Sequence, residues 1–476
     1  MPKSLFAALF AFVTLLLAFV ALAPVHAQTS DGDSKTTAPT REASVAEIDP
    51  IEDLSMMVLL GAPGEQDEAI ATLVERGNKD IVPTLVLFMR LSGNHIGIAK
   101  ALKSFTGETI TTWREAMLWQ EAHPEIVPHA SYRTIKLRFL ENIDPNFMEF
   151  FDDAHTSRAQ MKIRLEEITW GGVRVDGIPS LDNPNLIDAD KADYLKPDDL
   201  VFGVEINGDV RAYPLRIMGW HEMFNDVIGG VPVALAYCTL CGAGILFETD
   251  LEGRDKPLVF GSSGFLYRSN KLMFDRETRS LWNQFTGAPV AGPLVDAGIK
   301  LKIRPVTITS WQRWHLEHPQ TRVLSLETGH SRDYGSGVVY NDYFASPDLM
   351  FPTRVRDESR VKRKDYVFGI RAFGAAKAWP VEAFRKTPVI NDQVGGTKVV
   401  LIGDAGTRTV RAYESNGLTF AAGSAGKVSG PDGSWLRTES FIIGPDGRKL
   451  ARVPGHIAYW FAWDGYLGVE SALYNG

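Results

Sequence analysis

The stretch DLVFGVEINGDVRAYP, residues 199–214, decides the fold because the chain contains it in a second version, DYVFGIRAFGAAKAWP, at residues 365–380. The likeness continues without a gap, so that residues 199–249 align to residues 365–415 with 14 identities in 51 positions. A repeat of this kind indicates one structural unit used twice.

Each version alternates short apolar segments, rich in β-branched and aromatic residues, with Gly, Pro and Asn, which is typical of strands and tight turns. We therefore expect a mainly β domain built from two related copies. Copy 1 covers residues 165–339, copy 2 covers residues 365–476, and a polar linker over residues 340–364 joins them.

Residues 47–155 have a different texture, because their apolar residues recur at helical spacing. Ala69, Ile70, Leu73 and Val74, for example, fall on one face of a helix. Short antiparallel helices stacked as a solenoid-like domain fit this pattern, and such a domain often docks a protein partner. The fold class that we expect is α+β, with this helical-repeat segment preceding the β copies.

The first residues predict export from the cytoplasm. Lys3 is followed by an almost unbroken apolar run from Leu5 to Leu22 and by Val25-His26-Ala27, which is the order of a secretory signal peptide. We expect cleavage after residue 27, a disordered leader over residues 28–46, and no membrane span in the mature chain. The expected location is periplasmic or extracellular.

Composition excludes some classes of partner and leaves a single pair of cysteines. The net charge of −8 argues against nucleic acid as a partner, because phosphate backbones attract basic surfaces. Cys238 and Cys241 are the chain's two cysteines, so whatever they do, they do together.

These cysteines stand two residues apart in YCTLCG, residues 237–242, a spacing that directs both sulfurs to one point. A metal there needs further ligands, and His221 in the preceding Trp-His-Glu string is the best third candidate. The repeat supports this choice, because His221, Cys238 and Cys241 face Thr387, Asp404 and Thr407 while the turn residues are kept. Copper or zinc suits two thiolates and an imidazole.

Two other interpretations stay open for the Cys pair. It is a redox dithiol in a thiol–disulfide exchange protein, or it is a structural dithiol or local disulfide in a protein that needs no cofactor. The sequence does not decide whether the protein is an enzyme, and a non-catalytic recognition module is a third possible function.

Several other polar residues are candidates for the wall of a site. Glu222 follows His221, and the loop TGHSRDYGS carries His330 and Asp333. Ser263, next to Gly264, could hold an anion beside Arg268. The alternative for this stretch, residues 261–287, is an ordinary turn followed by a strand hairpin whose tip lies at residues 275–279.

The strings "DGIPSLDNP", "GWHEMFNDVIGGVPVALAYCTLCGAGILFET", "GFLYRSNKLMFDRETRSLWNQFTG" and "RDYGS" together resemble the uncharacterised family named domain of unknown function 3179. The resemblance spans about residues 168–476. It implies that the Trp-His-Glu and Cys-x-x-Cys strings belong to one domain. It implies no reaction, substrate or catalytic residue.

Overall fold

A computed structural model describes residues 49–93, 95–424 and 426–476 of the 476-residue chain. The signal peptide and the leader that the sequence predicts lie outside the described residues. Within the described residues, no helix combines the length and the apolar character that crossing a bilayer requires. These described residues form one compact unit.

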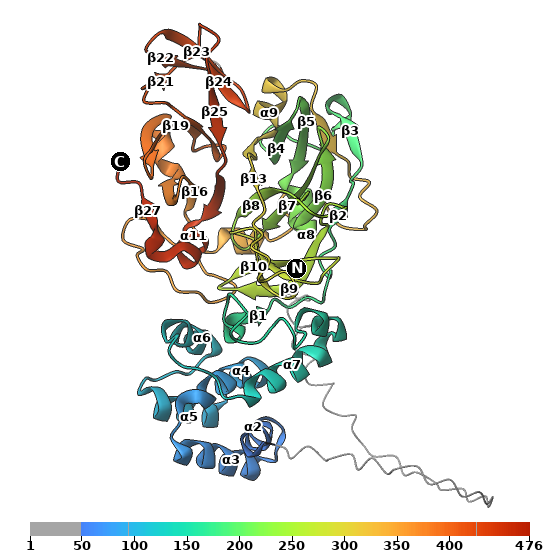
Figure 1. Ribbon diagram of the computed structural model, residues 1–476, viewed down its shortest axis with the longest axis vertical. Helices are drawn as coiled ribbons and strands as arrows, with labels where there is room; N and C mark the ends of the chain where they lie inside the picture. The colour runs from blue at the N-terminus through green and yellow to red at the C-terminus, as the bar shows by residue number, and fades with distance from the viewer. Residues whose placement is uncertain (1–48, 94, 425) are drawn as a thin grey trace, which may run out of the picture. The chain divides into compact units, whose positions relative to one another are not determined.

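The N-terminal part of this unit is helical, as the sequence predicted (Figure 1). Its α-helices are α2 (Pro50–Leu60), α3 (Pro63–Arg76), α4 (Val82–Ser92), α5 (Ile96–Thr106), α6 (Trp113–Ala122) and α7 (Ser131–Ile143). The local sequence explains where they begin and end. Proline occupies the first turn of α2, α3 and α4, and left-handed glycines follow α3 and α5. Thr112 and Glu115 form a capping box at α6.

The apolar faces of these helices pack around a shared core. Ile81, Leu85, Phe88 and Leu102 are among its fully buried members. Burial of such faces is what makes helices of only 10–14 residues stable. The solenoid-like repeat and the domain boundaries that the sequence suggested stay predictions.

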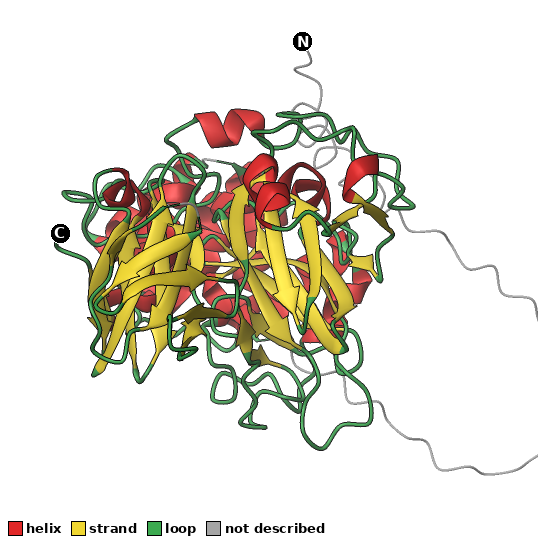
Figure 2. Ribbon diagram, turned by 90° about the horizontal axis from the view of Figure 1, so that it is seen from above, coloured by secondary structure: helices red, strands yellow, loops and turns green. Residues whose placement is uncertain are grey.

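The rest of the unit is mainly β, and its strands gather in two groups that lie side by side (Figure 2). A large hydrophobic cluster joins the two groups, since it contains both Phe202 and Phe368. The first group begins with the hairpin of β4 (Leu200–Ile206) and β5 (Asp209–Pro214). Helix α8 (Leu215–His221) then leads to the site.

Strands β6 (Met223–Ile228), β7 (Val231–Cys238) and β8 (Ala243–Glu248) form an antiparallel meander. The β6–β7 turn is Gly229-Gly230, where both glycines have positive φ. An added Cβ at Gly229 would lie 2.1 Å from the carbonyl oxygen of Ile206, so this position requires glycine.

A second sheet of the first group contains β1 (Ile168–Trp170), β9 (Phe260–Tyr267), β10 (Asn270–Asp275), β11 (Leu281–Asn283) and β12 (Ala288–Ala291). The sequence placed a hairpin tip at residues 275–279. The structure has an additional turn at Arg268-Ser269, between β9 and β10. Both residues take positive φ without being Gly or Asn, which is why no turn signal marked them.

The first group is completed by short segments that pair with these strands. They are β2 (Leu181–Asp182), β3 (Leu186–Asp188), β13 (Ile303–Arg304), β14 (Thr307–Ser310), α9 (Trp311–Glu317) and β15 (Arg322–Leu324). Helix α10 (Asn341–Ala345) lies in the stretch that the sequence marks as a linker.

The second group contains two further sheets. One consists of β16 (Tyr366–Ala372), β17 (Ala375–Pro380), β26 (His456–Tyr459) and β27 (Ser471–Leu473). The other consists of β18 (Val389–Val394), β19 (Thr397–Asp404), β20 (Thr409–Glu414), β21 (Ala421–Ala422), β22 (Lys427–Gly430), β23 (Gly433–Arg437), β24 (Phe441–Ile443) and β25 (Lys449–Val453). Helix α11 (Trp460–Leu467) follows β26.

Candidate functional site

The turn between β7 and β8 brings the two cysteines together as a disulfide. Cys238 ends β7 opposite Ala243 of β8, and its sulfur is bonded to that of Cys241. The Cys241 N–H donates to the Cys238 carbonyl at 3.2 Å, so the backbone folds tightly between them. Cys238 is 2% exposed and Cys241 is fully buried.

A buried ion pair lies beside this turn. Thr239, between the two cysteines, donates its hydroxyl to Glu222 at 2.6 Å, and Lys271 of β10 donates to the other oxygen of Glu222 at 3.2 Å. The side chains of Lys271 and Glu222 are 4% and 9% exposed. Because the removal of two charges from water is costly, a pair this deep needs close contact and further hydrogen bonds, such as that from Thr239, to offset the cost.

The same turn contacts the turn between β9 and β10 through a sulfur. The Cys241 sulfur lies 3.6 Å from the carbonyl oxygen of Ser269, in the β9–β10 turn. A thiol in this position can donate a weak hydrogen bond to that carbonyl. If the pair is reduced, the Cys241 thiol therefore has a hydrogen-bond acceptor in the Ser269 carbonyl.

Tyrosines cover the turn. The Tyr343 hydroxyl donates to the Leu240 carbonyl at 2.7 Å, and the Tyr340 hydroxyl lies 3.4 Å from Glu222. Burial, and then the charge of Glu222, raise the pKa of Tyr340. On the other side the Tyr459 N–H donates to the Cys241 carbonyl at 2.7 Å. The disulfide is thus closed off from solvent in this structure.

His221 binds other groups than the cysteines. Its Nδ1 lies 2.9 Å from the Pro179 carbonyl oxygen, and its Nε2 lies 2.6 Å from the Tyr334 hydroxyl. A carbonyl only accepts, so Nδ1 carries the proton and Nε2 accepts from Tyr334. Burial lowers the pKa of His221 to about 4, which agrees with this neutral form.

The metal centre that the sequence predicted is not assembled in this oxidised form. Cys238 and Cys241 are bonded to each other, so neither sulfur is a thiolate ligand, and both nitrogens of His221 are engaged. The physical reason lies at the end of α8. Glu222 takes a left-handed conformation there, with φ 54°, and it reaches the turn while the adjacent His221 reaches Pro179. Copper or zinc binding by the reduced protein stays a prediction.

The predicted wall residues fall in three places. Glu222 lies at the turn, as described. His330 is exposed, with its ring centroid 5.2 Å from that of His221, and Asp333 is an exposed loop residue that accepts the Gly335 N–H.

The other two wall residues, Ser263 and Arg268, do not form the anion cradle that the sequence suggested. Ser263 is buried in β9 and donates to the Leu272 carbonyl at 2.6 Å, so its hydroxyl is used within the sheet. Arg268 instead points to Glu167, with 2.7 Å between Nε and Oε2.

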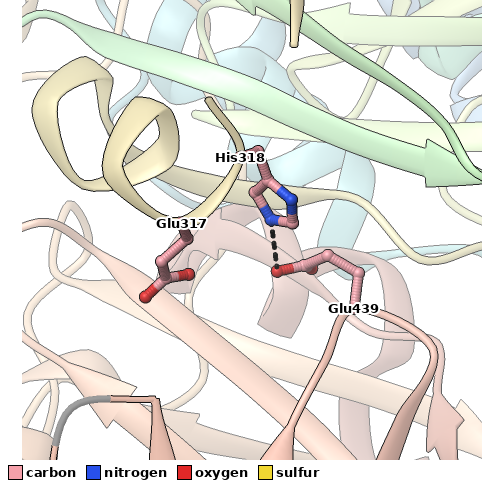
Figure 3. Close-up of side chains that lie close together, drawn as sticks. All are labelled: Glu317, His318 and Glu439. Carbon is pink, nitrogen blue, oxygen red and sulfur yellow. Dashed lines mark ion pairs between the residues drawn. The ribbon is translucent and has the colours of Figure 1, made fainter. Parts of the chain in front are cut away.

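A second cluster has the residue types of a metal site. Within the described part of the chain, the donor atoms of Glu317, His318 and Glu439 lie within 4.8 Å of one another (Figure 3). The dashed line in Figure 3 joins His318 Nε2 to Glu439 Oε1, which are 3.6 Å apart.

Arginine guanidinium groups donate hydrogen bonds to the carboxylates of Glu317 and Glu439. Arg411 donates to Glu439 at 2.7 Å and to Glu317 at 3.1 Å, Arg452 donates to Glu439 at 3.1 Å, and Arg437 donates to Glu317 at 2.6 Å. Although burial acts to raise it, Arg411, His318 and Arg452 hold the pKa of Glu439 well below its usual value. Arg313 also donates to Glu317, at 3.3 Å, so four guanidiniums bind the two carboxylates, and the cluster is an ion-pair network that ties α9 to the second group of strands.

Sequence reasoning missed Lys271 and Thr239. Lys271 is the one charged residue in the apolar run of NKLMF, residues 270–274, and a lysine inside a buried strand signals a paired charge. Thr239 could have been found from its place between the cysteines. Nothing in the local sequence links either residue to Glu222.

Comparison with known proteins gives a family and no activity. The family model described as Protein of unknown function (DUF3179) matches residues 175–469. No curated protein and no solved structure matches the chain significantly. The matched range contains the disulfide turn, Glu222, Lys271 and His221.

Proposed function

Because the chain belongs to the family described as Protein of unknown function (DUF3179), its function has to be inferred from its own site, and we propose that it is an exported thiol–disulfide redox protein. The reactive group in this proposal is the Cys238–Cys241 pair. This is the second of the interpretations that the sequence left open.

The observation that carries the proposal is the hydrogen bond from Thr239, inside the Cys-x-x-Cys turn, to the Glu222–Lys271 ion pair. A disulfide that only cross-links a hairpin needs no buried charges beside it, and apolar neighbours would cost the fold less. A redox couple does need them, because its thiols gain and lose protons in a buried place.

The reaction balances as a two-electron exchange. A small thiol attacks one sulfur of the pair and forms a mixed disulfide, and the other sulfur leaves as a thiolate that takes up a proton. A second external thiol then attacks the mixed disulfide and displaces the protein sulfur. Two external thiols thus become one external disulfide, and the protein holds two thiols. A hydrogen-bonded chain of Thr239, Glu222 and Lys271 lies at the turn. In this proposal the chain balances the negative charge of the thiolate.

Access requires movement of the stretch that covers the turn. Tyr340 and Tyr343 belong to residues 340–364, and Lys364 holds the end of helix α10 by donating to the Ser346 carbonyl at 2.6 Å. The stretch also buries Leu349, Phe351 and Val361 in the core around the disulfide, but its own hydrogen bonds lie outside the sheets, so we propose that it opens more easily than the hairpin unfolds. The proposal therefore includes a slow step that precedes attack on the disulfide.

We also propose that the two groups of strands are the two copies that the sequence predicted. Strands β4 and β16 both span seven residues and start 166 positions apart, at Leu200 and Tyr366. The same offset relates β5 to β17, β6 to β18, β7 to β19 and β8 to β20. Strand β14, which leads into α9, pairs with β4 in the antiparallel sense. Strand β26, which leads into α11, pairs with β16 in the same sense.

Side chains repeat with the strands. Added Cβ atoms at Gly203 and Gly369 would lie 2.3 Å and 1.9 Å from the rings of Trp314 and Trp463. In the first group Tyr213 and Arg211 bind Asp226, and in the second group Trp379 and Lys377 bind Asp392. This pattern supports duplication and makes the disulfide a feature of copy 1.

Export supports the redox assignment. Disulfides persist in the periplasm and outside the cell, where thiol-reducing systems of the cytoplasm do not act. The signal peptide that the sequence predicts would deliver the chain there. A protein partner for the helical segment, and a recognition function, stay predictions of the sequence.

The experiment is an equilibrium titration of the purified protein in buffers of defined thiol and disulfide ratio, with free thiols counted by alkylation and mass spectrometry. We expect one reversible two-electron transition. In Glu222→Gln the loss of the negative charge favours thiolate, so the midpoint potential should rise, by about 30 mV for each tenfold change in the equilibrium constant. Asp392→Asn, which removes the carboxylate of the Lys377 ion pair, is the matched control and should leave the potential unchanged.

Two outcomes would count against the proposal. One is a pair that stays oxidised until the protein unfolds, which would make the disulfide structural. The other is tight binding of zinc or copper by the reduced protein that is lost in His221→Ala, which would return the metal interpretation to first place.

A further inference from the structure

A cavity of about 490 Å³ lies between the helical segment and the β9–β10 turn, away from the disulfide. Its walls come from the start of α7, from residues 156–166, and from Tyr267 and Arg268. Cavities of this size hold small organic molecules. Most of the lining residues precede residue 175, where the match to the family begins, so the cavity belongs to this chain's own N-terminal part.

The walls of the cavity are cationic. Among the described residues that line it, Arg133, Arg158, Lys162, Arg164 and Arg268 carry positive charge, and Glu166 is the carboxylate. Burial and the nearby guanidiniums of Arg268 and Arg158 lower the pKa of Arg164, against the attraction of Glu166. Like charges are therefore crowded on this wall.

The partners of these cations are Glu166 in the wall itself, buried groups behind the wall, and carboxylates exposed to solvent. Arg158 binds both oxygens of Glu166 at 3.1 Å, and Arg164 and Arg268 share the buried Glu167. Arg133 donates to the carbonyls of Phe151 and Thr156, and its one carboxylate partner, Asp153, is 97% exposed. Lys162 pairs with Asp296, which is 61% exposed. The exposed partners of Arg133 and Lys162 are screened by water and salt, so the positive charge of these two side chains is only partly neutralised at the cavity.

The rest of the lining is mostly apolar and aromatic, with His129 and Thr156 as its polar members. Its larger apolar and aromatic side chains are Tyr132, Tyr267, Met161, Ile163 and Leu165. We infer that the cavity binds a small organic anion whose phosphate or carboxylate head meets the guanidiniums and whose apolar body lies against these side chains. Guanidinium groups match the oxygens of such heads in pairs, which gives specificity as well as attraction.

Calorimetric titration of the full mature protein with phenyl phosphate, benzoate and the neutral analogue benzamide tests this inference. We expect the two anions to bind with Kd below about 1 mM, benzamide to bind more weakly by about tenfold or more, and anion binding to weaken as NaCl rises from about 50 to 200 mM. Comparison of the affinities for phenyl phosphate and benzoate shows whether the site prefers a phosphate or a carboxylate head.

Variants locate the site. Lys162→Glu breaks only an exposed ion pair, so the protein should fold, and binding should weaken about threefold or more; with Arg158→Gln added, the loss should reach about tenfold. Lys191→Glu and Arg448→Gln are matched controls, because Lys191 is 67% exposed with Asp188 as its partner and Arg448 is 44% exposed, like Arg158. Both controls should bind as the wild type does.

The inference is overturned if benzamide binds as tightly as the anions, if neither anion binds, or if Lys162→Glu binds like Lys191→Glu. The redox titration of Cys238 and Cys241 is independent of all three results.

Discussion

The β7–β8 turn of the first group of strands and the β19–β20 turn of the second close in the same way with different chemistry. In the first, Cys238 and Cys241 are joined by a disulfide, and both are buried. In the second, the Thr407 hydroxyl donates to Asp404 at 3.0 Å, and Asp404 also binds Arg313 at the surface. A hydrogen bond thus suffices to close this hairpin, so the disulfide, with a buried ion pair beside it, needs another explanation.

The largest difference between the two regions should appear when each loses a lysine. Lys271→Met leaves Glu222 buried without its partner, which should lower the free energy of unfolding by about 3–5 kcal/mol. Lys377→Met breaks a pair that is 19% and 16% exposed, and it should cost about 1 kcal/mol. Urea unfolding of both variants makes the comparison, and equal losses would mean that the pair at the disulfide is not special.

Removal of the cross-links should have a smaller effect. Cys238→Ala with Cys241→Ala opens a loop of four residues, for which chain entropy predicts a loss of about 2 kcal/mol. Thr407→Val removes the corresponding hydrogen bond and should cost about 1 kcal/mol. Thermal unfolding at one pH measures both. A loss well above this for the cysteine variant would point to a structural disulfide.

The buried histidines make stability depend on pH. Burial lowers the pKa of His221 to about 4 and that of His456 to about 3, so in the unfolded state, where the pKa is near 6.5, each binds a proton more readily. Stability should be present in full above pH 6.5 and fall as pH drops, by about 1 kcal/mol per histidine between pH 6.5 and pH 5.5. Urea unfolding at several pH values should show half this slope in His221→Gln, and an unchanged slope would mean that folding does not lower the pKa of His221.

The smallest effect is expected at Glu317, His318 and Glu439. Because Arg411, Arg437 and Arg452 hold both carboxylates, added zinc should leave the melting temperature of the oxidised protein unchanged. A rise that is lost in His318→Ala would show that the metal displaces the guanidiniums.

How much of this structure can be predicted from the sequence depends on how far apart in the sequence the contacting residues lie. Local signals located several turns, since Asn207-Gly208 and Gly229-Gly230 do mark the turns after β4 and β6. The change from helix to strand along the chain was also visible in the period of the apolar residues. The Arg268-Ser269 turn escaped because neither residue is a usual one for positive φ.

The site was harder to predict because it is made of distant partners. The sequence directed attention to Cys238, Cys241 and Glu222, yet Lys271, the partner of Glu222, lies 49 positions further along the chain. The helix end at His221 was the second difficulty. One left-handed residue there sends adjacent side chains to different groups, and spacing alone does not reveal this.

The most direct test compares two rates in native buffer: reduction of the Cys238–Cys241 disulfide by dithiothreitol, and global unfolding measured by tryptophan fluorescence. We predict that both thiols become free to alkylation much faster than the protein unfolds, while the fluorescence stays native. Reduction that never outpaces global unfolding would contradict it, and would leave the pair as a cross-link in the β7–β8 hairpin.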